Sequence, residues 1–318
     1  MKTARHMALL GVWTLVLALY AAAQATNPAP VSQSPIVTAN PAPTAGQIHA
    51  LLARVVENQH RNDRAIEEFD RVEHVVLRKD GENSEILSDS TNRVLPSGTG
   101  TMKIQMAEKG LPVSQELQRR QLEYAVDALA RFNRPNERMK QDLMKFEKRR
   151  RDRAEMLDES AKAFLVTWGG RETRPDPIGT RGARTLAKLF LEPDPNFKPT
   201  SRLGVLFAHV HLVLWVDESQ AQIARLDADI TSDITFGGGI IAKVYRGGHV
   251  VMEQAEVALG IWLPTLLTYN VDGRKFLFAF GIHERTEVTR YRHVGPPAQS
   301  IEIIRNELNN MVAETPAR

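Results

Sequence analysis

The chain has 318 residues, 42% of them hydrophobic and 25% charged, and its 41 basic side chains exceed its 38 acidic ones by three. This near-neutral balance argues against a general nucleic-acid binder. The chain contains no cysteine, which excludes disulfides, thiolate catalysis and cysteine-based zinc sites.

The first 25 residues have the pattern of a cleavable secretory signal peptide. Lys2 and Arg5 precede an uncharged apolar run over 8–20, which is shorter than the about 20 residues that a membrane-spanning helix needs. Alternating alanines from Ala21 to Ala25 fit the small-residue cleavage rule. We therefore expect a periplasmic protein, released without a lipid anchor and not membrane-spanning after cleavage; a retained N-terminal anchor is the alternative.

The segment 26–43 carries five prolines among small polar residues, which predicts a disordered linker. Thr44 and Gln47 then form a capping box that predicts a helix over 45–62. From about Ile66 the hydrophobic period changes to that of strands, expected near 72–76, 84–88 and 99–107, with Asp80-Gly81 as a turn.

Residues 114–160 are predicted to form a helical insertion of two helices, interrupted near 133–136. The second helix carries a basic run at Lys148, Arg149, Arg150 and Arg151, and residues 145–153 hold six basic and two acidic side chains. Such a run is either the solvated side of a helix or a surface for an acidic partner or anionic lipid. These four residues are therefore candidate partner-binding residues.

From residue 162 onward the pattern predicts an antiparallel meander, because short strands alternate with turns. Turns are expected at 217–220, at Gly247-Gly248 and at Asp272-Gly273, the last two as hairpins. The expected strands lie near 163–173, 183–192, 209–217, 222–232, 239–246, 248–259, 261–271, 274–283 and 285–294. The whole of 44–294 is predicted to be one α+β domain, followed by a C-terminal helix and tail over 295–318.

The predicted sheet is apolar on both faces, so one face needs a cover that the helices can supply. The fold expected is therefore a curved antiparallel sheet, a partial barrel, covered by helices. Its interior is either filled by side chains or open to an apolar ligand. The candidate lining residues are Leu212, Leu214, Val250, Met252, Leu263, Leu267, Phe276, Phe278 and Phe280.

No catalytic motif is present. The glycine run 237–239 lacks the Lys-Ser/Thr of a phosphate loop, and His283-Glu284 lacks the second histidine of a zinc-protease motif. His209 and His211 stand two residues apart on one predicted strand and are weak candidates for a shared metal, for which the sequence supplies no third ligand. No cofactor is expected.

Three segments resemble the meander of the lipoprotein-carrier (LolA/LolB-like) superfamily: 214–217 (Leu-Trp-Val-Asp), 224–226 (Ala-Arg-Leu) and 262–264 (Trp-Leu-Pro). Asp80-Gly81 and 110–114 also resemble exported bacterial proteins of uncharacterised function. The resemblance implies a periplasmic incurved sheet, with helices on its concave side, that binds acyl chains. The charged helical insertion departs from the carrier pattern.

These observations favour a non-enzymatic periplasmic protein that binds or carries a lipid or a lipidated protein. One alternative is an envelope protein-interaction module with a filled core. A second alternative is a metal-dependent enzyme that uses His209 and His211.

Overall fold

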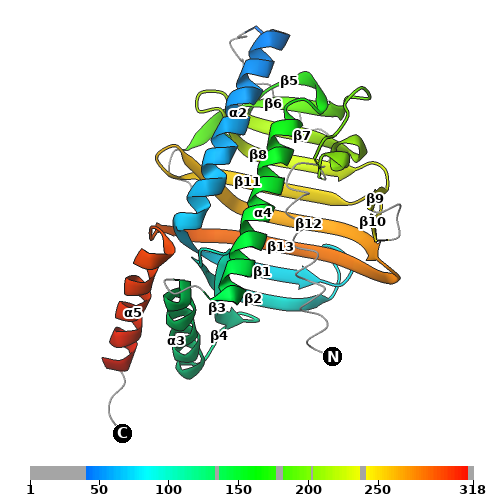
Figure 1. The fold of residues 1–318 in the computed structure, drawn as a ribbon. Coiled ribbons are helices and arrows are strands. Elements are labelled where there is room, and N and C mark those ends of the chain that lie inside the picture. The colour runs from blue at the N-terminus through cyan, green and yellow to red at the C-terminus, as the bar shows by residue number, and fades with distance from the viewer. Residues whose placement is uncertain (1–40, 133–135, 177–181, 202, 237–240, 314–318) are drawn as a thin grey trace.

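The computed structural model describes residues 41–132, 136–176, 182–201, 203–236 and 241–313. The predicted signal peptide, most of the predicted linker, the glycine run 237–239 and the end of the predicted tail lie outside these residues. The described chain is a mixed α and β structure built on one large antiparallel sheet of 13 strands that does not close into a barrel (Figure 1).

The sheet brings together strands that are far apart in the sequence, because the first strand of the described residues pairs with the last. Its order is β4-β3-β2-β1-β13-β12-β11-β8-β7-β6-β5, with the short β10 paired to β12 and to β9. The strands are β1 (Phe69–Arg78), β2 (Ile86–Pro96), β3 (Thr101–Glu108), β4 (Leu111–Pro112), β5 (Phe164–Pro175), β6 (Ala183–Pro193), β7 (Val210–Asp217), β8 (Gln222–Ile230), β9 (Ile234–Phe236), β10 (Ala242–Val244), β11 (His249–Ala258), β12 (Ile261–Lys275) and β13 (Phe278–His293).

Two helices cross one side of the sheet, which we call the inner face (Figure 1). Helix α2 (Ala45–Ala65) begins at the predicted capping box, where the Thr44 hydroxyl accepts from the Gln47 amide and the Gln47 side chain accepts from the Thr44 amide. Helix α4 (Glu137–Ser160) begins at Asn136, whose side chain caps the Met139 amide. Their apolar side chains join the main core with those of β6, β7, β8, β11 and β12.

Helices α3 (Gln115–Phe132) and α5 (Pro297–Ala313) pack together on the opposite, outer face. Leu95 of β2 and Ile104 of β3 point to this side and form a second core with Leu122 of α3 and Ile304 of α5. The predicted insertion 114–160 is therefore divided: α4 covers the inner face and α3 does not. None of the described helices is long and apolar enough to cross a membrane.

Two hairpin predictions are wrong. Asp272-Gly273 lies inside β12, and the chain turns at Phe276-Leu277, so the predicted strands 274–283 and 285–294 are mostly one strand, β13. Gly273 is required by close packing, since a Cβ there would lie 2.5 Å from the Lys243 carbonyl oxygen and 2.6 Å from the Phe280 ring. Gly247-Gly248 makes no hairpin either, because both residues bond to Ile230 at the end of β8.

The turn predicted at 217–220 is confirmed between β7 and β8. One Asp217 carboxylate oxygen accepts from the Ser219 and Gln220 amides at 3.0 Å, and the other accepts from the Arg184 guanidinium at 3.0 Å. Burial alone would raise the pKa of Asp217, but hydrogen bonds from the Ser219 hydroxyl, the Gln220 amide and Arg184 hold that pKa below its ordinary value of 3.8.

Replacing this carboxylate tests its contribution to stability. We expect Asp217→Asn to lower the free energy of unfolding by about 1–3 kcal/mol at neutral pH, because the charge-assisted bonds are lost. Since the pKa is lowered in the folded state, the stabilisation is present above 3.8 and disappears as the pH falls through the folded pKa. Urea unfolding should therefore show a difference between the two proteins that shrinks in acid. An equal difference in unfolding free energy at neutral and at acidic pH would contradict this assignment.

Candidate functional site

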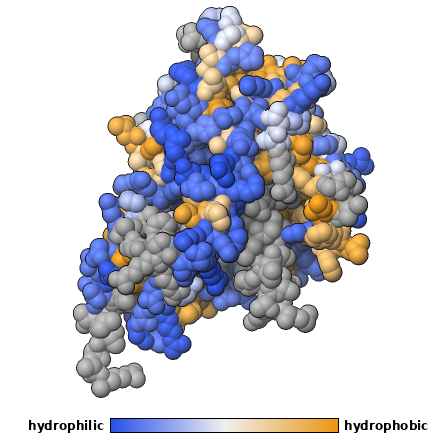
Figure 2. Space-filling view, viewed as in Figure 1, coloured by the Kyte–Doolittle hydropathy of each residue, from blue (hydrophilic) through white to orange (hydrophobic). Residues whose placement is uncertain are grey.

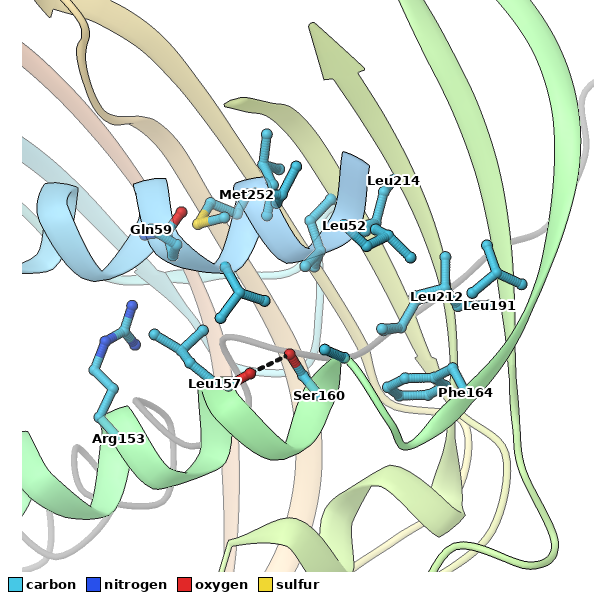
Figure 3. Close-up of a pocket in the computed structure, with 16 residues that line it drawn as sticks. Leu52, Gln59, Arg153, Leu157, Ser160, Phe164, Leu191, Leu212, Leu214 and Met252 are labelled. Atoms are coloured by element: carbon cyan, nitrogen blue, oxygen red, sulfur yellow. Dashed lines mark hydrogen bonds between the residues drawn. The ribbon is translucent and has the colours of Figure 1, made fainter. Parts of the chain in front are cut away.

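A small apolar cavity lies between the α2–α4 pair and the inner face. Its volume is about 70 Å³. Figure 3 shows α2 and α4 on two sides of it and the strands behind, with Arg153 and Gln59 towards one end and Phe164 at the other. Apart from Gln59, Arg153 and Ser160, every lining side chain is apolar: Leu52, Val55, Val56, Leu157, Ala161, Phe164, Val166, Leu191, Leu212, Leu214, Ile223, Leu226 and Met252.

Helix α2 is fixed to the sheet by a set of buried amides, which we call the amide network (Asn58, Gln59, Asn62, Gln222 and Gln254). The Asn62 side chain donates to Gln222 at 2.8 Å and accepts from the Trp262 backbone at 3.2 Å. Asn58 donates to the carbonyls of residues 220 and 221 at 2.9 Å. Because four of these five side chains are buried, moving α2 would leave polar groups unpaired in the core at a cost of about 1–3 kcal/mol each.

Helix α4 is attached to α2 by charged side chains instead, in two ion pairs and one histidine–carboxylate hydrogen bond that we call the latch. Arg153 pairs with Asp63 of α2, and His60 of α2 lies 2.8 Å from Asp158. Arg150 lies 3.7 Å from Glu67, just after α2. Asp158 is 68% exposed, and exposed pairs of this kind contribute about 0–1 kcal/mol each. Arg153 and Asp63 are only 19% and 21% exposed, so their pair is the best shielded of the three contacts. At the last turn of α4, Glu159 also accepts from the Thr200 and Ser201 amides, at 2.6 and 2.7 Å. Only Met156 and Leu157 of this 24-residue helix are buried.

The inner face is apolar at the cavity and polar farther along the sheet. Beyond β12 it carries a polar region formed by Arg71, Glu73, Lys103, Glu284 and Thr286, on strands next to the apolar core. Glu73 accepts from Arg71 at 3.0 Å and from Lys103 at 2.7 Å. Burial would raise the pKa of Glu73, but the two cations hold it below its ordinary value, whereas burial raises the pKa of Glu284. The inner face of the sheet thus has an apolar half and a polar half.

The predicted lining residues fall into three groups. Leu212, Leu214 and Met252 line the cavity. Val250 is buried in the same core, and Leu267 and Phe280 pack against it.

The third group lies elsewhere. Leu263 lies on the outer face, because β12 carries one extra residue where the pairing moves from Leu266–Glu253 to Pro264–Gln254. Phe276 and Phe278 lie at the exposed β12–β13 hairpin, 52% and 78% exposed, because the turn is four residues later than predicted.

The predicted basic run is partly engaged within the protein. Lys148 pairs with Asp152 at 2.8 Å, and Arg150 takes part in the latch. Arg149 reaches the Thr99 carbonyl at 3.5 Å, and Arg151 is exposed. This run therefore joins α4 to the β2–β3 turn and to the end of α2.

The two candidate metal-binding histidines face different partners. His209 lies at the end of a 3-10 helix (Gly204–His209), before β7, and its ring nitrogen lies 2.8 Å from the Ser232 hydroxyl. Burial lowers the pKa of His209, against the effect of Asp233. His211 lies 2.9 Å from Glu192. Within the described residues, no three His, Asp or Glu side chains are grouped so that they could hold a metal ion.

No protein family, no curated protein and no solved structure matches the chain.

Sequence reasoning missed the polar members of the site. Gln59 and Asn62 follow the apolar stripe of α2 at helical spacing, yet both are buried. Gln254 interrupts the apolar face of β11 and is only 1% exposed. A polar residue at a position that continues an apolar stripe is the sequence signal that would have identified them.

We predict that the latch restrains α4, so that losing one of its pairs lets this helix move more easily. We expect Asp63→Asn to speed hydrogen exchange of the α4 amides roughly fivefold, since a pair of about 1 kcal/mol is lost. Mass spectrometry of peptides from 137–160 measures this rate. The matched control is Asp142→Asn, which breaks a pair with Lys145 inside α4 only. Equal exchange in the two variants would show that the latch does not hold the helix.

Proposed function

We propose that this protein binds a single apolar chain, such as the acyl chain of a lipid or of a lipidated protein, between the inner face and the α2–α4 pair. The observation that carries this proposal is the cavity, whose walls are apolar along the sheet and both helices. Ligand sites of this kind are concave, mostly apolar, and carry a few placed polar groups.

Binding requires α4 to move away from the sheet. A cavity that accepts one benzene molecule holds about 150 Å³, roughly twice the volume present here. The amide network fixes α2, whereas the latch holds α4 by partly exposed charges. Displacing the two buried side chains of α4 would extend the cavity, and the incoming chain would replace the apolar contacts that these side chains lose.

The polar end of the cavity favours a ligand with a hydrogen-bond donor at its head. Gln59 lines the cavity and contacts Gln254, which donates to it at 3.3 Å. The carbonyl oxygen of the Gln254 side chain is buried and has no partner, an arrangement that costs about 1–3 kcal/mol. Gln254 does not itself line the cavity but contacts Gln59, which does. Once Gln59 moves aside, a hydroxyl, an amide or a protonated carboxylic acid would satisfy this acceptor.

A carrier role in the periplasm completes the proposal. The signal-like start of the sequence supports export, and the resemblance of residues 214–217 and 262–264 to lipoprotein carriers supports an acylated cargo. In this role the protein performs no chemistry. It shields an apolar chain from water and releases it when α4 opens.

Binding of a fluorescent fatty acid tests the proposal. We expect the purified protein to bind the probe, and Val56→Phe to weaken binding at least about tenfold, because the added ring occupies the cavity. The matched control is Val76→Phe in β1, which lies outside the cavity lining and is expected to bind as the wild type does. Thermal unfolding of both variants confirms that they fold. Unchanged probe affinity in Val56→Phe, or a wild-type protein that binds no probe, would contradict the proposal.

A further inference from the structure

The β12–β13 hairpin ends in an exposed apolar tip. Leu277 is 91% exposed, Phe278 78% and Phe276 52%, and Ile241 beside them is also exposed. Figure 2 shows hydrophobic residues at the right side of the molecule, where Figure 1 places the ends of β12, β13 and β10. Single exposed apolar residues are ordinary on a protein surface, but a group on one projecting turn marks an interaction site.

The backbone of the turn supports a functional reading. Phe276 has a φ of 53°, in the left-handed region that a bulky side chain rarely occupies. Two-residue hairpins usually place asparagine or glycine at such positions. The Phe276 amide donates to the Ile241 carbonyl at 2.9 Å, which ties the strained turn to the segment before β10. A phenylalanine kept in this conformation favours a role for its side chain outside the fold.

The surroundings of the tip are basic. Residues 233–246 and 272–279 contain Lys243, Arg246, Arg274 and Lys275 against two acidic side chains. Lys243 and Asp233 pair at 2.6 Å and neutralise each other, so the remaining count is three basic side chains, Arg246, Arg274 and Lys275, against Asp272. Lys275 of β12 is paired with Phe278 of β13, so a basic side chain lies next to the apolar tip.

We propose that this tip, Phe276-Leu277-Phe278 with its basic surround, inserts into the interface of an anionic phospholipid bilayer. Aromatic and aliphatic side chains enter the boundary between headgroups and acyl chains, while lysine and arginine remain at the phosphates. A protein partner fits less well, because stable interfaces bury about 800 Å² on each side, whereas this tip is a two-residue turn. The proposal does not depend on ligand binding in the cavity.

Co-sedimentation with vesicles tests the proposal. The full chain is mixed with vesicles of phosphatidylglycerol and phosphatidylcholine, and in parallel with phosphatidylcholine alone. We expect binding to the anionic vesicles that weakens as salt is added. The double variant Leu277→Ser/Phe278→Ser should bind at least about tenfold more weakly. The matched control is Leu259→Ser at the β11–β12 hairpin, where Leu259 is 92% exposed, and it should bind as the wild type does.

A second measurement locates the contact. Because the chain has no cysteine, Leu277→Cys and Leu259→Cys each carry one environment-sensitive fluorophore. Fluorescence should rise with anionic vesicles for the label at 277 and stay constant for the label at 259. Equal responses at both positions, or wild-type protein that stays in the supernatant, would overturn the proposal. A dimer in ultracentrifugation that the double variant loses, without vesicle binding, would assign the tip to a second copy and also overturn it.

Discussion

The amide network between α2 and the sheet is the interaction on which the rest of the structure depends. Asn62 bridges Gln222 of β8 and the backbone of Trp262 in β12, so one helix residue joins strands that are separated in the sheet by β11. These bonds are buried, and breaking one of them would leave a buried polar group unpaired at a cost of about 1–3 kcal/mol. The network therefore fixes the position of α2, the apolar stripe of α2 covers part of the inner face, and the remaining width is left to α4.

The two helices differ in how they are held, and this difference gives the site its proposed mechanism. Buried hydrogen bonds are costly to break, whereas partly exposed ion pairs exchange readily with water and salt. A cover made of one fixed and one movable helix can open without disturbing the sheet. The polar region beneath the first part of α4, where Glu73 bonds Arg71 and Lys103, remains satisfied when the helix moves, because its partners lie on the sheet itself.

Much of the fold follows from local sequence signals, and the departures have identifiable causes. The Thr44–Gln47 capping box, the basic helix α4 and the turn at Asp217 appear where the sequence predicts them, because each depends on residues a few positions apart. Asp272-Gly273 misled the prediction, since glycine serves there to admit the neighbouring β10 backbone. That contact is long-range and leaves no local pattern.

The site was predictable in its apolar half and not in its polar half. Leu212, Leu214 and Met252 alternate along their strands and reach the cavity as expected. Leu263 was misassigned because a single extra residue in β12 reverses the alternation. The role of Gln254 depends on its hydrogen bond with Gln59, which lies 195 residues away in the sequence. The polar half of the site therefore depends on contacts between distant helices and strands, which the composition of each segment does not reveal.

A crystal structure of the protein with a brominated long-chain fatty acid tests the central claim most directly, because bromine is located independently by its anomalous signal. We predict the bromine between α2 and the inner face, near Leu214 and Met252, with α4 displaced and α2 in place. Bromine bound only elsewhere, with α4 still closed over the cavity, would contradict the account.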